Sequence, residues 1–249
     1  MMVASEILLR CIGSGDAFGS GGRLNSCFYL KTSFSQMLLD CGSSSLIGMQ
    51  RCGVVASDID TVIISHLHGD HFGGIPYLLL EGKYVSQRTK PLTLIGPKGL
   101  QQRVEAVSKA LYPGIMGKNN FPVEYRELDP KKSLQFNSTH IECFQVKHGS
   151  SQHAYGLRVE TGGRVISYTG DTEWTENLIP LSQGSDLLIS ECFAYDQPLP
   201  SHMDYRTLLK QRSRLGCRKL VLTHMGPEML SRLDELELDT VNDGDIIEI

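Results

Sequence analysis

The chain has 249 residues, of which 41% are hydrophobic and 21% charged, and its formal net charge at pH 7 is −4. This length and apolar content are enough for a buried core, and we expect residues 1–249 to form a single domain. The acidic balance excludes the strongly basic surface of a protein dedicated to binding nucleic acid.

Cysteine usage and the lack of long apolar runs indicate the cellular compartment. The chain has 7 cysteines, and no two of them form a C-x-x-C pair. Several lie inside apolar runs, such as Cys143, so we expect reduced, buried thiols and a cytoplasmic protein. The N-terminal segment does not fit a signal peptide, because its apolar run is short and contains a glutamate. No stretch approaches the roughly 20 apolar residues of a membrane span, so we expect no membrane association.

The predicted elements follow a strand-rich order from the N-terminus. Short apolar runs between glycine-rich turns predict strands over residues 6–12, 26–32, 36–40, 61–65 and 92–96, with helices near 72–81 and 98–110. The second half predicts strands over 140–146, 154–161, 164–169, 186–191 and 219–224, with helices near 174–182 and 203–215. This order predicts the α/β class, with two sheets packed face to face and helices outside them.

A cluster of ligand-type residues follows the strand predicted over 61–65. It comprises His66, His68, Asp70 and His71, and a glycine pair follows it. Two imidazoles at positions i and i+2 can bind one cation, and the Asp-His pair can bind a second. Imidazole nitrogen and carboxylate oxygen suit zinc, and also manganese or iron. A histidine-rich surface turn is the structural alternative, but this position directly after a buried strand favours a metal site.

Three further candidates lie at the ends of predicted strands. His148 follows the strand over 140–146, Asp171 follows the strand over 164–169, and His224 ends the strand over 219–224. Each of them alone is more often a half-buried histidine or a capping aspartate. Their matching positions, in a chain that already holds the histidine cluster, predict that they join the same metal centre.

These motifs together resemble the metallo-β-lactamase superfamily. The resemblance runs through Gly13-Ser14-Gly15-Asp16-Ala17, LLDCG at 38–42, SHLHGDH at 65–71, KHGS at 147–150, TGDT at 169–172 and THM at 223–225. It implies an αββα sandwich of two mixed sheets with a two-metal site along one edge.

The resemblance also implies a role for each ligand. The first metal ion would be held by His66, His68 and His148, and the second by Asp70, His71 and His224. Asp171 would bridge the two ions. Asp40 matches an acid that orients the metal-binding loop in this superfamily. A strand-terminal turn aspartate is the alternative interpretation of Asp40.

Two residues indicate the branch of the superfamily. A bridging carboxylate at Asp171 is typical of phosphodiesterases, thioesterases and lactonases, and it lets a hydroxide sit between two cations, which suits in-line attack on phosphorus. His202 lies 22 positions before His224 and resembles the histidine that lies beside the scissile phosphate in the ribonuclease Z branch. Such an imidazole can protonate a leaving alkoxide. The alternative is a helix-capping position, for which Ser201 is the better candidate.

The spacing between two ligands departs from that branch. Asp171 lies only 23 positions after His148, which leaves room for two strands and a turn but not for the arm that clamps tRNA. We therefore expect a ribonuclease Z-like phosphodiesterase without this arm. The net charge of −4 also argues against a stable tRNA complex.

These features predict a binuclear metal-dependent hydrolase that acts on a small phosphodiester or cyclic phosphate. Asp70 and His202 are the predicted catalytic residues, and the cofactors are two divalent metal ions, expected to be zinc, with manganese or iron as alternatives. The resemblance implies a homodimer. The rival functions are a lactonase or thioesterase acting at a carbonyl, an arm-less ribonuclease, and a non-hydrolytic metal-binding protein.

Overall fold

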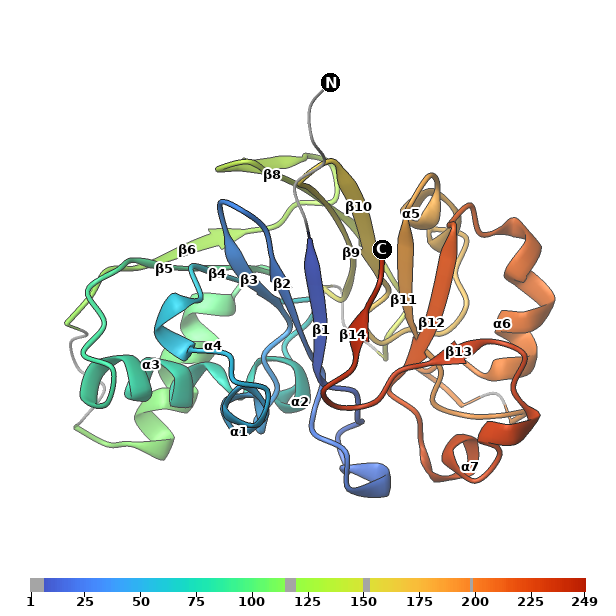
Figure 1. The fold of residues 1–249 in the computed structure, drawn as a ribbon, viewed down its shortest axis with the longest axis horizontal. Coiled ribbons are helices and arrows are strands. Elements are labelled where there is room, and N and C mark those ends of the chain that lie inside the picture. Colours follow the sequence, from blue (N-terminus) through green and yellow to red (C-terminus); the bar gives the residue numbers. More distant parts are fainter. Residues whose placement is uncertain (1–6, 115–119, 150–152, 198) are drawn as a thin grey trace.

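The computed structural model describes residues 7–114, 120–149, 153–197 and 199–249. Residue 6 of the first predicted strand and residue 150 of the KHGS motif lie outside these ranges. Two seven-stranded sheets face each other with helices on both outer sides (Figure 1). The predicted α/β class and the αββα arrangement are therefore confirmed.

The first sheet comes from the N-terminal half, apart from one strand at the C-terminus. Its strands in spatial order are β14 (Ile246–Ile247), β1 (Leu8–Gly13), β2 (Cys27–Lys31), β3 (Gln36–Leu39), β4 (Thr61–Ile63), β5 (Leu92–Gly96) and β6 (Val123–Glu127). The helices of this half are α1 (Ser45–Arg51), α2 (Gly69–Phe72), α3 (Ile75–Tyr84) and α4 (Leu100–Leu111).

The second sheet comes from the C-terminal half. Its strands in spatial order are β13 (Asp239–Thr240), β12 (Lys219–Thr223), β11 (Leu187–Glu191), β10 (Arg164–Tyr168), β9 (Tyr155–Thr161), β8 (Thr139–Gln145) and β7 (Leu134–Phe136). The helices that cover its outer face are α5 (Leu178–Ser182), α6 (Tyr205–Gln211) and α7 (Pro227–Leu230) (Figure 1).

Alternation along the strands builds the layers. In β2, Phe28 and Leu30 point into the core between the sheets, whereas Tyr29 packs with the residues of α1, α3 and α4 on the outer side. In β12, Val221 joins the central core and Leu222 packs under the helices of the second half. Successive side chains of a strand point to opposite faces, so each apolar run serves two layers.

The topology gathers strand ends at one edge of the sandwich. β3, β4 and β5 run parallel in the first sheet, as do β10, β11 and β12 in the second. β8 and β10 are both antiparallel to β9, so β8 runs in the same direction as β10. The carboxyl ends of β3, β4, β8, β10, β11 and β12 therefore lie on edges where loops from distant parts of the chain converge.

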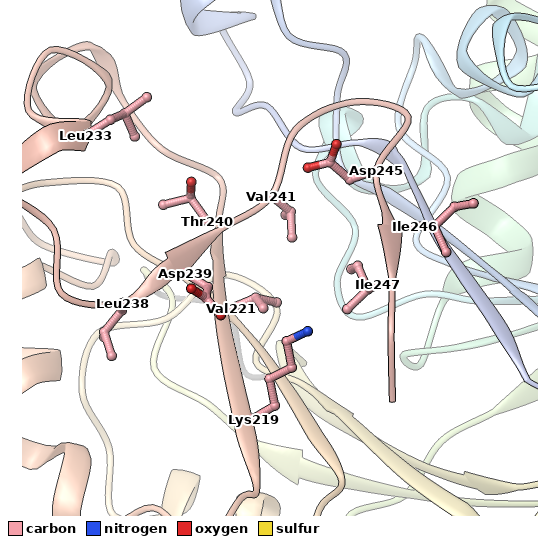
Figure 2. A pocket seen from close by; sticks show the side chains of 10 residues that line it. All are labelled: Lys219, Val221, Leu233, Leu238, Asp239, Thr240, Val241, Asp245, Ile246 and Ile247. Atoms are coloured by element: carbon pink, nitrogen blue, oxygen red, sulfur yellow. The ribbon is translucent and has the colours of Figure 1, made fainter.

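A groove lies elsewhere, where the last strands of the two sheets separate. Its lining includes Lys219 at the start of β12, Asp239 of β13 and Ile247 of β14 (Figure 2). None of the predicted ligands lines it, and His224 follows the opposite end of β12.

Several elements differ from their predictions. The helix predicted near 203–215 begins at Tyr205 and ends at Gln211, where a 3-10 turn follows. The helix predicted near 174–182 is shorter and begins at Leu178. β6 was not predicted, because its sequence VEYRE is largely polar and its residues are exposed or half-buried at the edge of the sheet. Among the described residues, no helix has the length and apolar character needed to cross a membrane.

Candidate metal centre

The predicted ligands converge from both sheets. His66, His68, Asp70 and His71 lie in the segment after β4 and in the first turn of α2. His148 follows β8, Asp171 follows β10 and His224 follows β12. The loops after these strands therefore bring together all seven residues that the sequence singled out as ligands.

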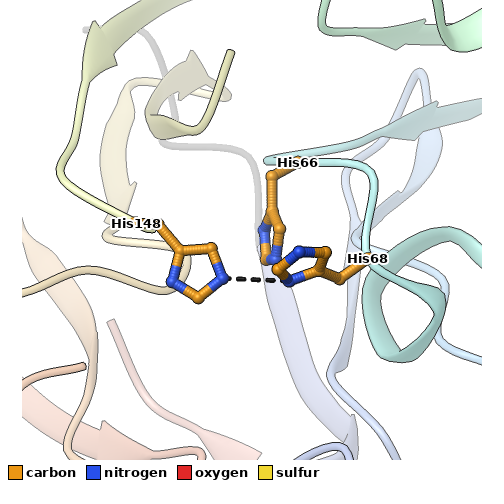
Figure 3. A group of neighbouring side chains, drawn as sticks. All are labelled: His66, His68 and His148. Carbon is orange, nitrogen blue, oxygen red and sulfur yellow. Dashed lines mark hydrogen bonds between the residues drawn. The ribbon is translucent and has the colours of Figure 1, made fainter. Parts of the chain in front are cut away.

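One group consists of three histidines, His66, His68 and His148. Their ligand-type nitrogens lie within 4.8 Å of one another, and Figure 3 shows the three rings pointing toward a common point. Nε2 of His148 lies 2.9 Å from Nδ1 of His68. Two ring nitrogens at this distance need a proton or a cation between them, because their lone pairs otherwise repel.

The second group consists of Asp70, His71, Asp171 and His224, whose ligand-type atoms also lie within 4.8 Å of one another. Nε2 of His71 lies 3.2 Å from Asp70 and 3.1 Å from Asp171. Nε2 of His224 lies 3.3 Å from Asp70 and 3.4 Å from Asp171. Asp171 also reaches the first group, since its carboxylate lies 3.9 Å from both His66 and His148. This central position is the one required of a bridging ligand.

Unpaired buried atoms test whether the centre fits metal ions. Nε2 of His66 is buried and has no hydrogen-bond partner within the described part of the chain, and Nε2 of His71 and Oδ1 of Asp171, although 3.1 Å apart, lack the alignment of a hydrogen bond. Buried polar atoms are normally paired, and leaving one unpaired costs about 1–3 kcal/mol. Coordination to a divalent cation would satisfy these atoms, and the nitrogen and oxygen donors are of the type that zinc binds. The residues therefore fit a metal centre.

The charges of the second group also favour cations. Burial lowers the pKa of His71, but the carboxylates of Asp171, Asp70 and Asp40 outweigh it and raise this pKa well above its usual value. Burial likewise lowers the pKa of His224, yet Asp171 and Asp70 raise it to about 9. The positive charge of the two protonated imidazoles offsets the negative charge of the buried carboxylates. A bound metal ion would replace these protons and supply the positive charge instead.

Asp40 orients the metal-binding segment, as predicted. Its fully buried carboxylate accepts hydrogen bonds from the backbone N–H of Ser65 at 2.7 Å and from the Ser65 hydroxyl at 2.7 Å. It also lies 2.6 Å from Nδ1 of His71. This contact directs Nε2 of the His71 ring toward Asp70 and Asp171. The alternative of a simple turn aspartate does not account for these contacts.

Gly42 allows the Asp40 loop to approach this segment. A Cβ atom on Gly42 would lie 2.2 Å from the carbonyl oxygen of Asp70, which is closer than real Cβ atoms come to any neighbour. The LLDCG motif therefore needs glycine at this position.

His202 lies beside both groups of ligands. The centroid of its ring is 5.1 Å from that of His148 and 5.7 Å from that of His224, and the rings of His202 and His224 are stacked with an interplanar angle of 14°. The capping alternative is wrong: Asp204 occupies the N-cap of α6 and accepts a hydrogen bond from the N–H of Thr207. Neither Ser201 nor His202 caps this helix.

Glu191 is a site residue that the sequence reasoning missed. It ends β11 and is almost fully buried, and its Oε2 lies 3.2 Å from Nδ1 of His202. Its other oxygen accepts a hydrogen bond from the backbone N–H of Thr172, next to Asp171. Burial raises the pKa of Glu191, and the hydrogen bond from His202 partly offsets this rise. Its position at a strand end, shared with Asp171 and His224, was the available signal.

Phe193 forms an aromatic wall beside these histidines. Its ring centroid lies 5.0 Å from that of His202 and 6.2 Å from that of His224. The side chain is half-buried, so part of it remains at the surface of the site. The apolar ring of Phe193 therefore packs against one side of the His202 imidazole.

Comparisons with known proteins agree with this architecture. Residues 7–242 match the family model described as anti-Pycsar protein Apyc1. Ribonuclease Z of Agathobacter rectalis is 27% identical, and the alignment covers 81% of this chain and 82% of that protein.

Two solved structures share the fold. The metallo-β-lactamase fold protein YhfI of Bacillus subtilis has a TM-score of 0.78 at 22% identity, covering 98% of this chain and 99% of its own. A diphosphatase of the PhnP family has a TM-score of 0.79 at 17% identity, covering 98% of each chain. The fold, the motifs and the family match lead to one assignment. This chain belongs to the metallo-β-lactamase superfamily of metal-dependent hydrolases, in its ribonuclease Z-like branch, and to the family of the anti-Pycsar protein Apyc1.

Proposed function

We propose that the protein is a binuclear metal-dependent phosphodiesterase that acts on a small phosphodiester or cyclic phosphate. The observation that carries this proposal is the Glu191–His202 pair beside the two groups of ligands. Hydrolysis of a phosphodiester needs a proton for the leaving oxygen, and a histidine paired with a buried carboxylate is suited to supply it.

The two groups of ligands would hold the metal ions. His66, His68 and His148 would bind one divalent cation, Asp70, His71 and His224 the other, and Asp171 would contact both. Such cations lower the pKa of a water molecule and neutralise charge on phosphoryl oxygens. Zinc is the proposed metal because the donor set is rich in imidazole.

The protein side chains supply the remaining parts of the reaction. Nδ1 of His202 donates to Glu191, which leaves Nε2 for the substrate. Burial lowers the pKa of His202, but the hydrogen bond and the charge of Glu191 raise it above its usual value overall, which favours the protonated ring that a proton donor needs. The carboxylate of Asp70 lies 3.3 Å from Nε2 of His224, whose ring is stacked on that of His202, and it would orient the attacking water. His71 holds the pKa of Asp70 far below its usual value despite partial burial, so it stays ionised.

The proposed substrate is small because the described residues between His148 and Asp171 form no arm. Between His148 and Asp171, β9 and β10 pair directly and are joined by a turn at Gly162 and Gly163. The tRNA-clamping arm of the ribonuclease Z branch would have to leave the fold here. The net charge of −4 also gives little long-range attraction for a polyanion. We therefore propose that the protein forms no stable complex with tRNA.

A substrate panel tests the proposal. Metal-loaded protein is expected to hydrolyse bis(p-nitrophenyl) phosphate faster than a lactone or a thioester, and a chelator should abolish this activity. Hydrolysis of the lactone or thioester alone would contradict the phosphodiesterase assignment and support attack at a carbonyl. Cleavage of precursor tRNA in preference to small diesters would instead support an arm-less ribonuclease.

A cytoplasmic location is proposed with this function. All 7 cysteines are free, and Cys11, Cys27, Cys41, Cys143 and Cys192 are buried. Free, buried thiols are typical of proteins from a reducing compartment.

A further inference from the structure

The turn at Ser201 connects a predicted metal ligand with the predicted proton donor. The carbonyl oxygen of Ser201 accepts a hydrogen bond from Nδ1 of His148 at 2.8 Å, and the next residue in the chain is His202. A hydrogen bond to Nδ1 fixes the tautomer and the orientation of an imidazole, so that Nε2 is free to bind a metal ion. The position of this short turn therefore affects both His148 and His202.

The Ser201 turn has an unfavourable backbone conformation. Ser201 has a φ of 79°, in the left-handed region that residues other than glycine rarely adopt. Such a conformation persists only when surrounding contacts hold it. One contact is the hydrogen bond from the backbone N–H of Gly149 to the Ser201 hydroxyl, at 2.9 Å.

Glu173 provides the second contact. Its Oε1 accepts a hydrogen bond from the backbone N–H of Ser201 at 2.9 Å, and its Oε2 accepts one from Nζ of Lys147 at 2.7 Å. The backbone N–H of Glu173 also donates to the carbonyl oxygen of Lys147 at 2.9 Å. Glu173 thus joins the segment that carries Asp171, the segment that carries His148 and the turn before His202.

The ion pair between Glu173 and Lys147 does not by itself explain why Glu173 is held against the Ser201 turn. The Lys147 side chain is 65% exposed, and exposed ion pairs contribute little to stability. The bond to Ser201 is different, because it acts on a backbone group of a strained turn. That turn in turn holds His148, which is only 4% exposed.

We propose that Glu173 is a positioning residue, which holds the Ser201 turn and so sets the orientation of His148 toward the metal and the place of His202 beside it. The effect on His202 rests on the proposed phosphodiesterase function. The effect on His148 does not, because it concerns a ring tautomer and the affinity for metal.

Four variants separate this role from a surface ion pair. Glu173→Ala removes the acceptor for Ser201, whereas Glu173→Gln keeps an oxygen that can accept the same hydrogen bond. Lys147→Met removes the ion pair but leaves the acceptor. Glu176→Ala is the matched control. Glu176 lies on the same segment as Glu173 and also forms an ion pair, with Arg214, but it contacts no ligand of the centre in the described structure.

Two measurements need no substrate. In metal-free protein, ¹⁵N NMR of the histidine rings is expected to show a proton on Nδ1 of His148, and Glu173→Ala should lose this single tautomer. Competition of zinc with a chelating dye should show affinity falling about 10- to 100-fold in Glu173→Ala, the range typical of residues that orient metal ligands. Glu173→Gln, Lys147→Met and Glu176→Ala should all remain close to wild type.

Turnover provides a third measurement. Glu173→Ala should lower kcat on bis(p-nitrophenyl) phosphate more than it changes KM, and Glu173→Gln should restore kcat. The proposal would be overturned if Glu173→Ala kept the wild-type zinc affinity and the wild-type tautomer of His148. It would also be overturned if Lys147→Met lost as much zinc affinity as Glu173→Ala. If the alanine variant does not fold, Glu173→Asp decides, because its shorter side chain withdraws the acceptor and should weaken zinc binding. Absence of phosphodiesterase activity in the wild-type protein would contradict the proposed function. The His148 tautomer and the zinc affinity would then still decide the role of Glu173.

Discussion

His71 connects the two halves of the molecule at the metal centre. Its Nδ1 lies 2.6 Å from Asp40 at the end of β3, and its Nε2 lies 3.1 Å from Asp171 at the end of β10. The hydroxyl of Tyr168, in the last position of β10, lies 3.5 Å from the same Nδ1. A residue predicted from a local motif thus obtains its orientation from side chains far away in sequence.

The sequence predicted the metal ligands better than the residues that orient them. His66, His68, Asp70 and His71 lie within one short motif, so their chemistry could be predicted without the fold. Glu191 offered only its position at a strand end as a signal, and its contact with His202 could not be predicted because it depends on how a loop brings His202 to it. Ser201 was considered only as a helix cap and Glu173 was missed, because their contacts depend on a backbone carbonyl and a backbone N–H, which no residue type reveals.

Replacing His202 tests its role as proton donor. We expect His202→Ala to keep both metal ions and to lower kcat on a phosphodiester about 10²- to 10⁴-fold, the usual contribution of a general acid. Elemental analysis and steady-state kinetics check the two parts. His140→Ala is the control, because His140 lies near the start of β8, whereas His148 follows its end. Unchanged turnover in His202→Ala would remove this residue from the reaction.

Proton release should accompany metal binding. Without a cation, His71 has a pKa well above its usual value and His224 has a pKa of about 9, so both are protonated at pH 7. Metal ligands must lose these protons, and we expect release of about two protons per chain at pH 7. The number should fall as the pH rises through 9, since His224 is then already neutral.

Calorimetry in two buffers with different heats of ionisation measures this release. The apparent enthalpy of metal binding should differ between the buffers at pH 7, and the difference should shrink above pH 9. Equal enthalpies in both buffers at pH 7 would show that His71 and His224 are neutral before metal binds.

At the scale of the elements, parallel strands explain why the site forms where it does. The ligands follow β4, β8, β10 and β12, and Glu191 ends β11. Most of these strands were predicted to within one or two residues, because apolar alternation and glycine turns are local signals. β6 was missed, and the helix over 203–215 was predicted too long, because edge exposure and the end of α6 depend on the neighbouring layers.

The central core holds the two sheets in register at this edge. Phe28 of β2 is fully buried, and its ring centroid lies 5.5 Å from that of Tyr168 in β10, across the interface between the sheets. Phe28→Ala should lower the free energy of unfolding by about 3–5 kcal/mol, because it removes apolar contacts and leaves a cavity.

Urea denaturation measures this loss, and a second phenylalanine gives the control. Phe34 is 79% exposed in the turn between β2 and β3, so Phe34→Ala should change the free energy of unfolding by less than about 0.5 kcal/mol. Similar values for the two variants would contradict the placement of Phe28 between the sheets.

At the scale of the whole molecule, the fold could be predicted because the motifs occur in the right order along the chain. The substrate could not, because it depends on the shape and charge of a surface built from many loops. The single domain and the homodimer expected from the sequence remain predictions. For this fold we propose that seven side chains from both sheets form one centre for two metal ions.

The metal-to-protein ratio tests this claim most directly. Protein reconstituted with zinc and freed of excess metal should contain about two ions per chain, and Asp171→Ala should contain about one or fewer, because the bridge contacts both groups. Inductively coupled plasma mass spectrometry gives both values. One ion or none in the wild-type protein, or two ions retained in Asp171→Ala, would contradict the claim.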